Sequence, residues 1–314
     1  FVSCHLAAHH DKVSNRNEDY MDISGEPKIK RKKFKGYEIS NQFDYLFWFG
    51  DLNYRINLSF AETLKVVTSD KGRREELMKG LYEKDQLNKE HKEKRAFVGY
   101  VPVVPTFPPT YRMKKGMHPP AYNSELARIP SWCDRILYKK TPHPSYAVDV
   151  LNFASILSIV TSDHTPIRGE FRVTMPPTPP PSLSSPLSLS AKYYLVVTEL
   201  RGNNLKAGDA GKSSDPFLKL SSPKIMKKYI TDTKKQTLNP VWDEKIEIPF
   251  EATTTFDLIQ SRVLYVRVID YDYLVSNDEL GQLRLLFPKR LNEEVSFCEP
   301  VISFGVEAGT IQGK

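Results

Sequence analysis

The stretch "FWFGDLNYR", residues 47–55, combines a predicted buried strand with polar residues at its end. Its bulky apolar residues indicate a strand covered on both faces, as in the centre of a layered α/β fold. Gly50 permits a turn, and Asp51 and Asn53 lie two positions apart, so strand geometry would point both side chains the same way. A carboxylate beside a carboxamide at a sheet edge suggests a chemical site, although Asp-x-Asn alone is a common turn.

The composition of the whole chain is that of a globular protein. Its 314 residues, of which 40% are hydrophobic and 26% charged, favour two domains. No apolar run reaches membrane-spanning length, so we expect any membrane contact to be peripheral. The three cysteines lie far apart without metal-ligand spacing, which favours a reducing, cytosolic location over a disulfide framework.

A proline- and serine-rich stretch divides the chain. Residues 175–190 have linker composition, with six prolines, five serines and no charge. Before the linker, predicted strands alternate with charged helical stretches, which favours an α/β domain over residues 1–174. After it, short alternating runs over residues 191–314 favour an all-β sandwich. The expected strands of the first domain are 1–6, 45–49, 156–161 and 168–174, and its expected helices include 59–68 and 71–81.

Basic residues are concentrated in the first domain. Residues 1–174 hold 28 Lys and Arg against 21 Asp and Glu, which accounts for the net charge of +7. This excess suits an anionic partner: nucleic acid, a phosphorylated ligand or an acidic membrane. The run "KIKRKKFK", residues 28–35, is equally compatible with a solvated loop and with a membrane-facing polybasic loop.

Three more stretches repeat the pattern of an apolar strand followed by polar residues. His5 ends "FVSCH", "RIPSWCDRIL" spans residues 128–137, and "IVTSDHTPI" places Asp163 and His164 after apolar residues. In an α/β layer the carboxyl ends of neighbouring strands converge on one crevice. Any one of these residues alone is more often structural, but four such stretches in one domain predict an active site.

Together these stretches resemble the inositol polyphosphate 5-phosphatases of the endonuclease/exonuclease/phosphatase superfamily. "FWFGDLNYR" fits the signature W-x-G-D-x-N-[FY]-R, and "RIPSWCDRIL" fits P-[SA]-W-C-D-R-[IV]-L. "FVSCHLAAH", "FPPTYR" and "SDHTPI" resemble three further blocks in the same order. The resemblance covers nearly all of residues 1–174 and implies a four-layer α/β/β/α phosphatase fold that is incomplete at its N-terminus.

The resemblance also implies catalytic roles that phosphate-ester hydrolysis requires. Asp51 would orient and deprotonate the attacking water, and Asn53 would hold the phosphate. His164 would contact the scissile phosphate, and Asp163 would orient His164 or the metal shell. His5 would donate a hydrogen bond to a phosphate oxygen.

The expected substrate-binding residues are four. By resemblance, Tyr111, Arg112 and Arg128 would contact the phosphate next to the one removed, and Arg135 is a further candidate. Some family members carry a lysine where this chain has Leu126, which weakens the prediction that a neighbouring 4-phosphate is required.

The expected cofactor of the first domain is magnesium. In the family this chain resembles, the main magnesium carboxylate and an accompanying Asn lie upstream of any residue present here. We therefore expect the 314-residue chain alone to be inactive. We also expect its first half to fold poorly, because strands 45–49 and 156–161 would lack neighbours in the sheet.

The second domain resembles the C2 family. "NLKAGDAGKSSDPFLKL", "TLNPVWDEKIEIPF" and "VLYVRVIDYDYLVSNDELGQLRL" match consecutive C2 blocks, with the last strand cut short by the end of the chain. Five carboxylates on loops at one end would repel one another without a hard cation. We therefore expect this domain to bind calcium, and favour this over the alternative that it is one of the C2 domains that have lost calcium binding. Lysines 224, 227, 228, 234 and 235 form either a phosphoinositide-facing patch or a solvated face. The expected calcium ligands are Asp209, Asp215, Asp270, Asp272 and Asp278.

The predicted function is a phosphoinositide 5-phosphatase. It would act on phosphatidylinositol 4,5-bisphosphate or 3,4,5-trisphosphate at the cytosolic membrane face, with the C2 domain docking on anionic lipid. Two alternatives remain: a catalytically dead lipid-binding adaptor, and a nucleic-acid phosphodiesterase of the same superfamily. The absence of the aromatic-basic interleaving that tracks a nucleic-acid strand disfavours the second.

Overall fold

A computed structural model describes residues 1–25, 36–125, 127–142, 144–174, 194–208, 213–222, 228–249, 263–273, 276–288, 290 and 292–314, without the side chains of 71–73 and 75. The chain forms two compact units. Unit 1 comprises residues 1–26, 43–141 and 146–174, and unit 2 comprises residues 27–42, 142–145 and 175–314. No helix among the described residues is long and apolar enough to cross a membrane.

Unit 1 is built on a mixed sheet with the strand order β1-β2-β4-β3. Strand β1 runs parallel to β2, whereas β4 is antiparallel to both β2 and β3. Strands β5 and β6 pair with each other as a separate antiparallel hairpin. The strands of unit 1 are β1 (Val2–His5), β2 (Tyr45–Asp51), β3 (Val101–Pro102), β4 (Asp134–Lys140), β5 (Ala147–Ser155) and β6 (Ile167–Thr174).

The helices of unit 1 follow from local capping and from burial. Ser59 caps α3 through a capping box with Glu62, and Asp85 caps α5 by accepting a hydrogen bond from the backbone N–H of Asn88 at 2.9 Å. The rings of Trp48, Tyr20 and Phe97 pack together at centroid distances of 4.1–5.4 Å. The helices are α1 (Val13–Gly25), α3 (Phe60–Val67), α4 (Lys71–Glu83) and α5 (Gln86–Lys92).

Two expectations about unit 1 are wrong. Residues 156–161 do not form a strand; they belong to the connection between β5 and β6, where Leu157 is 55% exposed. Strand β2 does not lack neighbours either, because it pairs with β1 on one side and β4 on the other. The expected helices 59–68 and 71–81 are confirmed as α3 and α4. The first half of the chain therefore has its own core.

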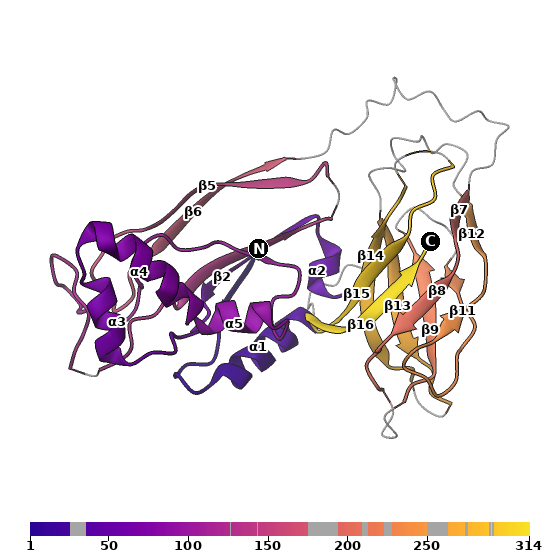
Figure 1. Ribbon diagram of the computed structural model, residues 1–314, viewed down its shortest axis with the longest axis horizontal. Coiled ribbons are helices and arrows are strands. Elements are labelled where there is room, and N and C mark those ends of the chain that lie inside the picture. The colour runs from indigo at the N-terminus through magenta and orange to yellow at the C-terminus, as the bar shows by residue number, and fades with distance from the viewer. Residues whose placement is uncertain are drawn as a thin grey trace. The chain divides into compact units, whose positions relative to one another are not determined.

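The described residues of unit 2 form strands together with one short helical segment. Within its described residues, one sheet has the order β10-β9-β13-β14-β15-β16-β8-β11, and β12 pairs with β7 (Figure 1). The fully buried Trp242, Leu218 and Val268 belong to its apolar core. The strands are β7 (Tyr194–Val197), β8 (Leu200–Asn203), β9 (Pro216–Ser221), β10 (Tyr229–Ile230), β11 (Val241–Trp242), β12 (Ile246–Pro249), β13 (Val263–Asp270), β14 (Glu279–Leu286), β15 (Phe297–Ser303) and β16 (Val306–Gly313).

The helical segment of unit 2 comes from early in the sequence. Helix α2 (Ile39–Gln42) belongs to this unit although β2 of unit 1 follows it closely in the chain. Asn41 Nδ2 donates to Gln282 Oε1 at 3.0 Å, and the hydroxyls of Tyr37 and Ser221 lie 2.5 Å apart. The compact units therefore do not follow the predicted boundary at residue 174 throughout.

Candidate active site

Three neighbouring strands of unit 1 place polar residues in one row. His5 pairs with Asp51 in the register of β1 and β2, and Asp51 pairs with Asp134 in the register of β2 and β4. His5 Nε2 lies 3.4 Å from Asp51 Oδ2. Gly50 makes this possible, because a Cβ at this position would lie 2.1 Å from the carbonyl oxygen of Cys4 and its φ of +133° is one that L side chains rarely adopt.

His164 completes the row from the loop before β6. Its Nδ1 lies 2.9 Å from Asp134 Oδ2, and its Nε2 lies 3.8 Å from Asp51 Oδ2. Thr110 Oγ1 also donates to Asp134 Oδ2, at 2.6 Å. The short contact with Asp134 anchors the imidazole through Nδ1. The contact with Asp51 is longer, so Nε2 faces the space beside that carboxylate.

Burial and charge shift the protonation of this cluster. Burial raises the pKa of Asp51, and the charge of Asp134 raises it further against the opposing effect of His164 and His5. Burial acts to lower the pKa of His164, but the hydrogen bond and charge of Asp134, with Asp51 and Asp163, outweigh it and raise that pKa. Perturbed groups in contact are typical of functional sites.

Asn53 has a different environment from the one expected. It is 2% exposed, and its φ of +56° ends the strand geometry, so its side chain does not follow that of Asp51. Its Nδ2 donates to the carbonyl of Leu6 at 3.0 Å, and its Oδ1 accepts from Arg55 Nη2. Its backbone N–H donates to Asp51 Oδ1 at 3.1 Å. Asn53 therefore orients the Asp51 carboxylate from within the protein, whereas the sequence suggested a direct hold on phosphate.

The predicted substrate-binding loop lies next to this cluster. The rings of Tyr111 and His164 have centroids 4.7 Å apart. Arg112 Nε lies 3.2 Å from Asp163 Oδ2, and Lys115 Nζ lies 3.8 Å from Asp163 Oδ1. Asp163 thus faces the basic residues of this loop and holds them in place.

Two predicted substrate contacts remain. Arg128 is exposed, whereas Arg135 is buried and cannot contact a substrate. Arg135 is 1% exposed, and its Nη1 lies 2.8 Å from Asp85 Oδ1, a carboxylate that is itself fully buried. An arginine enclosed with its counter-ion cannot reach a ligand, so the expected role for Arg135 does not fit the structure. The buried ion pair between Arg135 and Asp85 instead links β4 to the start of α5.

Three residues near the cluster have no role in the sequence prediction: Asp134, Thr110 and Arg55. The signal for Asp134 was present, because it is a carboxylate at the start of a strand inside the second signature. What the sequence does not contain is the register that sets Asp134 opposite Asp51. Arg55 lies in the first signature, and its guanidinium carbon is 4.3 Å from the centroid of the Tyr111 ring.

The cluster of Asp51, Asp134 and His164 is able to face a metal ion. Each residue offers one ligand atom, and these atoms lie within 4.8 Å of one another. Burial raises the pKa of Asp51, and the charge of the neighbouring Asp134 raises it further. Two adjacent carboxylates fit a divalent cation, because magnesium is usually held by one or two carboxylates together with water. The donor set therefore fits magnesium through its carboxylates.

Those of the predicted calcium ligands that the structure describes lie at or near the ends of strands in unit 2. Asp209 falls outside the described residues. The backbone N–H of Asp215 donates to Asp270 Oδ1 at 2.6 Å, and the backbone N–H of Asp278 donates to Asp272 Oδ2 at 3.3 Å. Four of the five aspartates are thus linked in pairs across the loops. The described residues yield no metal-sized group of three there.

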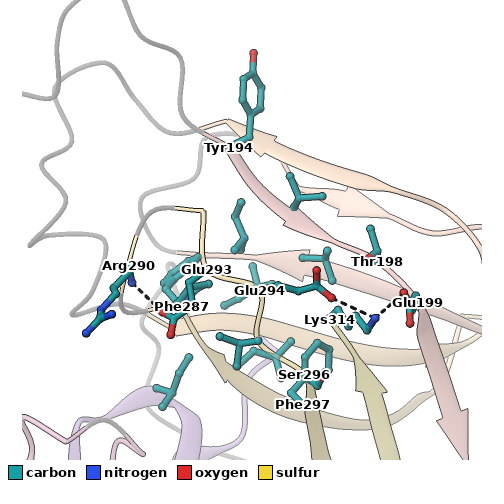
Figure 2. A pocket seen from close by; sticks show the side chains of 18 of the residues that line it. Tyr194, Thr198, Glu199, Phe287, Arg290, Glu293, Glu294, Ser296, Phe297 and Lys314 are labelled. Carbon is teal, nitrogen blue, oxygen red and sulfur yellow. Dashed lines mark hydrogen bonds and ion pairs between the residues drawn. The ribbon is translucent and has the colours of Figure 1, made fainter.

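Unit 2 also contains a cavity of about 710 Å³ (Figure 2). Apolar side chains such as Leu264, Leu285 and Phe287 line it. At its margin, Lys314 Nζ lies 3.1 Å from Glu199 Oε1 and 3.2 Å from Glu294 Oε1. None of the described calcium-ligand candidates lines this cavity, so it is separate from the aspartate loops.

Comparison with known families defines both parts of the chain. Residues 1–170 match the profile of the Endonuclease/Exonuclease/phosphatase family 2, and residues 193–298 match the C2 domain. The first match covers more than half of the chain, which therefore belongs to that family. A C2 domain follows the phosphatase-type domain, so the predicted fold classes are confirmed. Both families generally use divalent metals.

Curated relatives match the first domain. Phosphatidylinositol 3,4,5-trisphosphate 5-phosphatase 2 of Sus scrofa is 36% identical over 179 residues, and that of Homo sapiens is 35% identical over the same length. Each match covers 55% of this chain and 14% of the relative. The chain thus spans only a small part of the length of these relatives.

Among solved structures, the inositol polyphosphate 5-phosphatase domain of SpSynaptojanin, in complex with inositol (1,4)-bisphosphate and calcium ion, is 30% identical. The match covers 55% of this chain and 47% of that chain, with a TM-score of 0.45. A C2 domain of plant Extended Synaptotagmin 1 is 22% identical over 38% of this chain and 88% of that chain, with a TM-score of 0.32. Both TM-scores lie below 0.5, so the family assignment rests on the sequence matches.

Proposed function

We propose that unit 1 is the catalytic part of a phosphomonoesterase that removes the 5-phosphate of phosphoinositides. The observation that carries this proposal is the row of His5, Asp51 and Asp134 on three adjacent strands, with His164 anchored beside it. In this proposal, Asp51 is the base and the imidazoles of His5 and His164 are the phosphate contacts around one space. The names of the curated 5-phosphatases support the substrate class.

In the proposed mechanism, Asp51 orients the attacking water and accepts its proton. A raised pKa suits a general base, because it brings the basicity of the carboxylate closer to neutral pH. His164 holds a proton at Nε2 and directs it at a phosphoryl oxygen, because Asp134 anchors Nδ1 and favours the cationic form. His5, whose side chain is 73% exposed, donates to a second oxygen. Fixed donors at the equatorial oxygens stabilise the transition-state charge.

A bound magnesium ion would neutralise phosphoryl charge and polarise a phosphoryl oxygen. Asp51 and Asp134 are the carboxylates of this chain that would face it.

Tyr111, Arg112 and Arg128 are the proposed contacts for the neighbouring ring phosphate. Tyr111 adjoins His164, and Asp163 holds Arg112 in the same loop, so a phosphate bound there would sit next to the one being cleaved. Arg128 is exposed and free to approach from solvent. The basic excess of the first domain supports an anionic substrate over a neutral one.

For unit 2, we propose calcium-dependent docking on anionic lipid at the cytosolic face of membranes. Asp209, Asp215, Asp270, Asp272 and Asp278 are the proposed ligands, because oxygen donors on adjacent loops are what calcium binds. Neutralising these loops would remove their repulsion from lipid phosphates. Vesicle binding in calcium and in chelator tests this step.

The phosphatase assignment is tested with three substrates on the longest natural form of the protein that contains residues 1–314. We expect magnesium-dependent phosphate release from phosphatidylinositol 4,5-bisphosphate and 3,4,5-trisphosphate, and no nicking of plasmid DNA. Asp51→Asn should lower kcat by about 100-fold or more, because the base is lost. Nicking of DNA without release of inositol phosphate would identify a nucleic-acid enzyme, and binding without turnover would identify an adaptor.

A further inference from the structure

Arg55 is a buried cation next to the proposed catalytic row, and it has no part in the proposed mechanism. It is 8% exposed and lies two residues after Asn53 in the first signature. None of the ion pairs among the described residues gives it a carboxylate partner. Burial of an unpaired guanidinium is costly, so its neighbours must compensate.

The first group of neighbours is the turn that carries Asn53. Arg55 Nε donates to the backbone carbonyl of Asn53 at 3.0 Å, and Nη2 donates to Asn53 Oδ1. These two bonds hold Asn53 at a φ of +56°, a conformation in which its backbone N–H reaches Asp51 Oδ1. The Arg55 guanidinium therefore fixes the orientation of the Asp51 carboxylate indirectly, through Asn53.

The second neighbour is the ring of Tyr111. The guanidinium carbon of Arg55 is 4.3 Å from the centroid of that ring, at cation–π distance. The Tyr111 ring in turn adjoins the His164 imidazole, at a centroid distance of 4.7 Å. Arg55 thus contacts both the Asn53 turn, which orients Asp51, and the Tyr111 ring, which packs against His164. These two catalytic side chains approach each other, with Asp51 Oδ2 3.8 Å from His164 Nε2.

We propose that Arg55 is a positioning residue that sets the separation of Asp51 and His164 by clamping the Asn53 turn and stacking on Tyr111. The inference rests on the proposed phosphatase function. Arg55 would not touch the substrate: its donors are directed at Asn53 and its plane at the Tyr111 ring. Its contribution is geometric, and misplacing a catalytic group by about 1 Å can cost up to about 100-fold in rate.

The test is the effect of Arg55→Lys on kcat and KM for a soluble inositol 5-phosphate substrate, in the longest natural form of the protein. Lysine keeps the charge but loses the two-pronged bond to Asn53 and the planar stack on Tyr111. We expect kcat to fall about tenfold or more while KM changes less than about threefold, because alignment and not substrate contact is lost.

A double-mutant cycle separates positioning from general destabilisation. Tyr111→Phe keeps the ring, so Arg55→Lys should cost the same factor in that background as in the wild type. Tyr111→Leu removes the ring, so the double variant should be at least about threefold more active than the product of the two single losses predicts.

Arg16→Lys is the matched control. Arg16 is also buried, at 0% exposed, and its guanidinium carbon lies 5.1 Å from the centroid of the Tyr54 ring. Its donors, however, face the carbonyls of Ala7 and His9 and the Oε1 of Gln86, at 2.7 Å. We expect Arg16→Lys to lower the unfolding temperature as much as Arg55→Lys does, with a smaller loss of kcat. Its effect should multiply independently with Tyr111→Leu.

An unchanged kcat in Arg55→Lys, or independent effects of Arg55→Lys and Tyr111→Leu, would overturn the inference while leaving the phosphatase function standing. A wild-type protein that releases no phosphate from inositol substrates would instead remove the proposed function itself. The two failures are therefore distinguished by the wild-type measurement.

Discussion

At the residue scale, the proposed site depends on a histidine held between two carboxylates. His164 is anchored by Asp134 at 2.9 Å and faces Asp51 at 3.8 Å, while Thr110 donates to the same oxygen of Asp134. Asp134 thus has the same orienting role toward the histidine that a buried aspartate has in other acid–base sites: it fixes the ring and stabilises its charged form.

This pair predicts a pH dependence of folding stability. The pKa of His164 is raised in the folded state, so the pair contributes stability that is complete below the unfolded value of about 6.5 and is lost as the pH rises through the folded pKa. Asp134→Asn removes the negative charge that does most to raise the pKa of His164. The variant should therefore show a smaller change in the free energy of unfolding across this pH range. Urea unfolding of the 314-residue chain at about pH 6 and pH 8.5 measures the difference.

Asp149→Asn serves as the control for that measurement, because Asp149 is an exposed aspartate on β5 in the same unit. It should keep the wild-type slope. If Asp134→Asn also kept the wild-type slope, the His164–Asp134 pair would not be present in solution.

The sequence predicts part of this site through its resemblance to a known family. Asp51, His164 and Tyr111 follow from their signatures, and the structure brings them together. Asp134 and Arg135 are adjacent in sequence but differ in environment: one faces the cluster and the other is buried against Asp85. Which of two neighbouring polar residues is enclosed depends on the helices that pack there, and a local pattern does not contain that information.

At the element scale, the site depends on the close approach of β1 to β2. Gly50 allows it, since a Cβ would lie 2.1 Å from the carbonyl oxygen of Cys4. Gly50→Ala should therefore push the strands apart and lower the free energy of unfolding by at least about 2 kcal/mol, from steric overlap together with an unfavourable φ. Denaturant unfolding of the 314-residue chain measures the loss.

Gly80→Ala provides the opposite expectation. Gly80 lies on an exposed face of α4, and a Cβ there would meet nothing within 4 Å. Alanine should stabilise the helix by about 0.5–1 kcal/mol. Equal stability of Gly50→Ala and the wild type would show that β1 does not pack on β2 as described.

Element prediction succeeds where local signals are strong. Helix α3 has both an amphipathic pattern and a capping box, and the predicted helix agrees with it to within one residue at each end. The prediction for residues 156–161 fails because an apolar run without alternation resembles a buried strand. There the apolar side chains of Leu157 and Ile159 are 55% and 43% exposed in a connection between strands.

At the scale of the whole molecule, a phosphatase-type domain and a C2 domain are joined in one chain. In the proposed function, unit 1 carries the chemistry and unit 2 binds the membrane. Capture on a lipid surface raises the local concentration of a lipid substrate, so calcium would increase turnover of membrane lipid and leave turnover of soluble substrate unchanged.

The most direct test is the position and rate of phosphate release from vesicles that contain phosphatidylinositol 4,5-bisphosphate, measured with magnesium in calcium and in chelator. We predict release of the 5-phosphate, several-fold faster in calcium. Asp272→Asn should abolish the calcium effect, whereas Asp243→Asn, an exposed aspartate of the same unit, should not. Release of the 4-phosphate, or no release at all from the folded longest natural form of the protein that contains residues 1–314, would contradict the central claim.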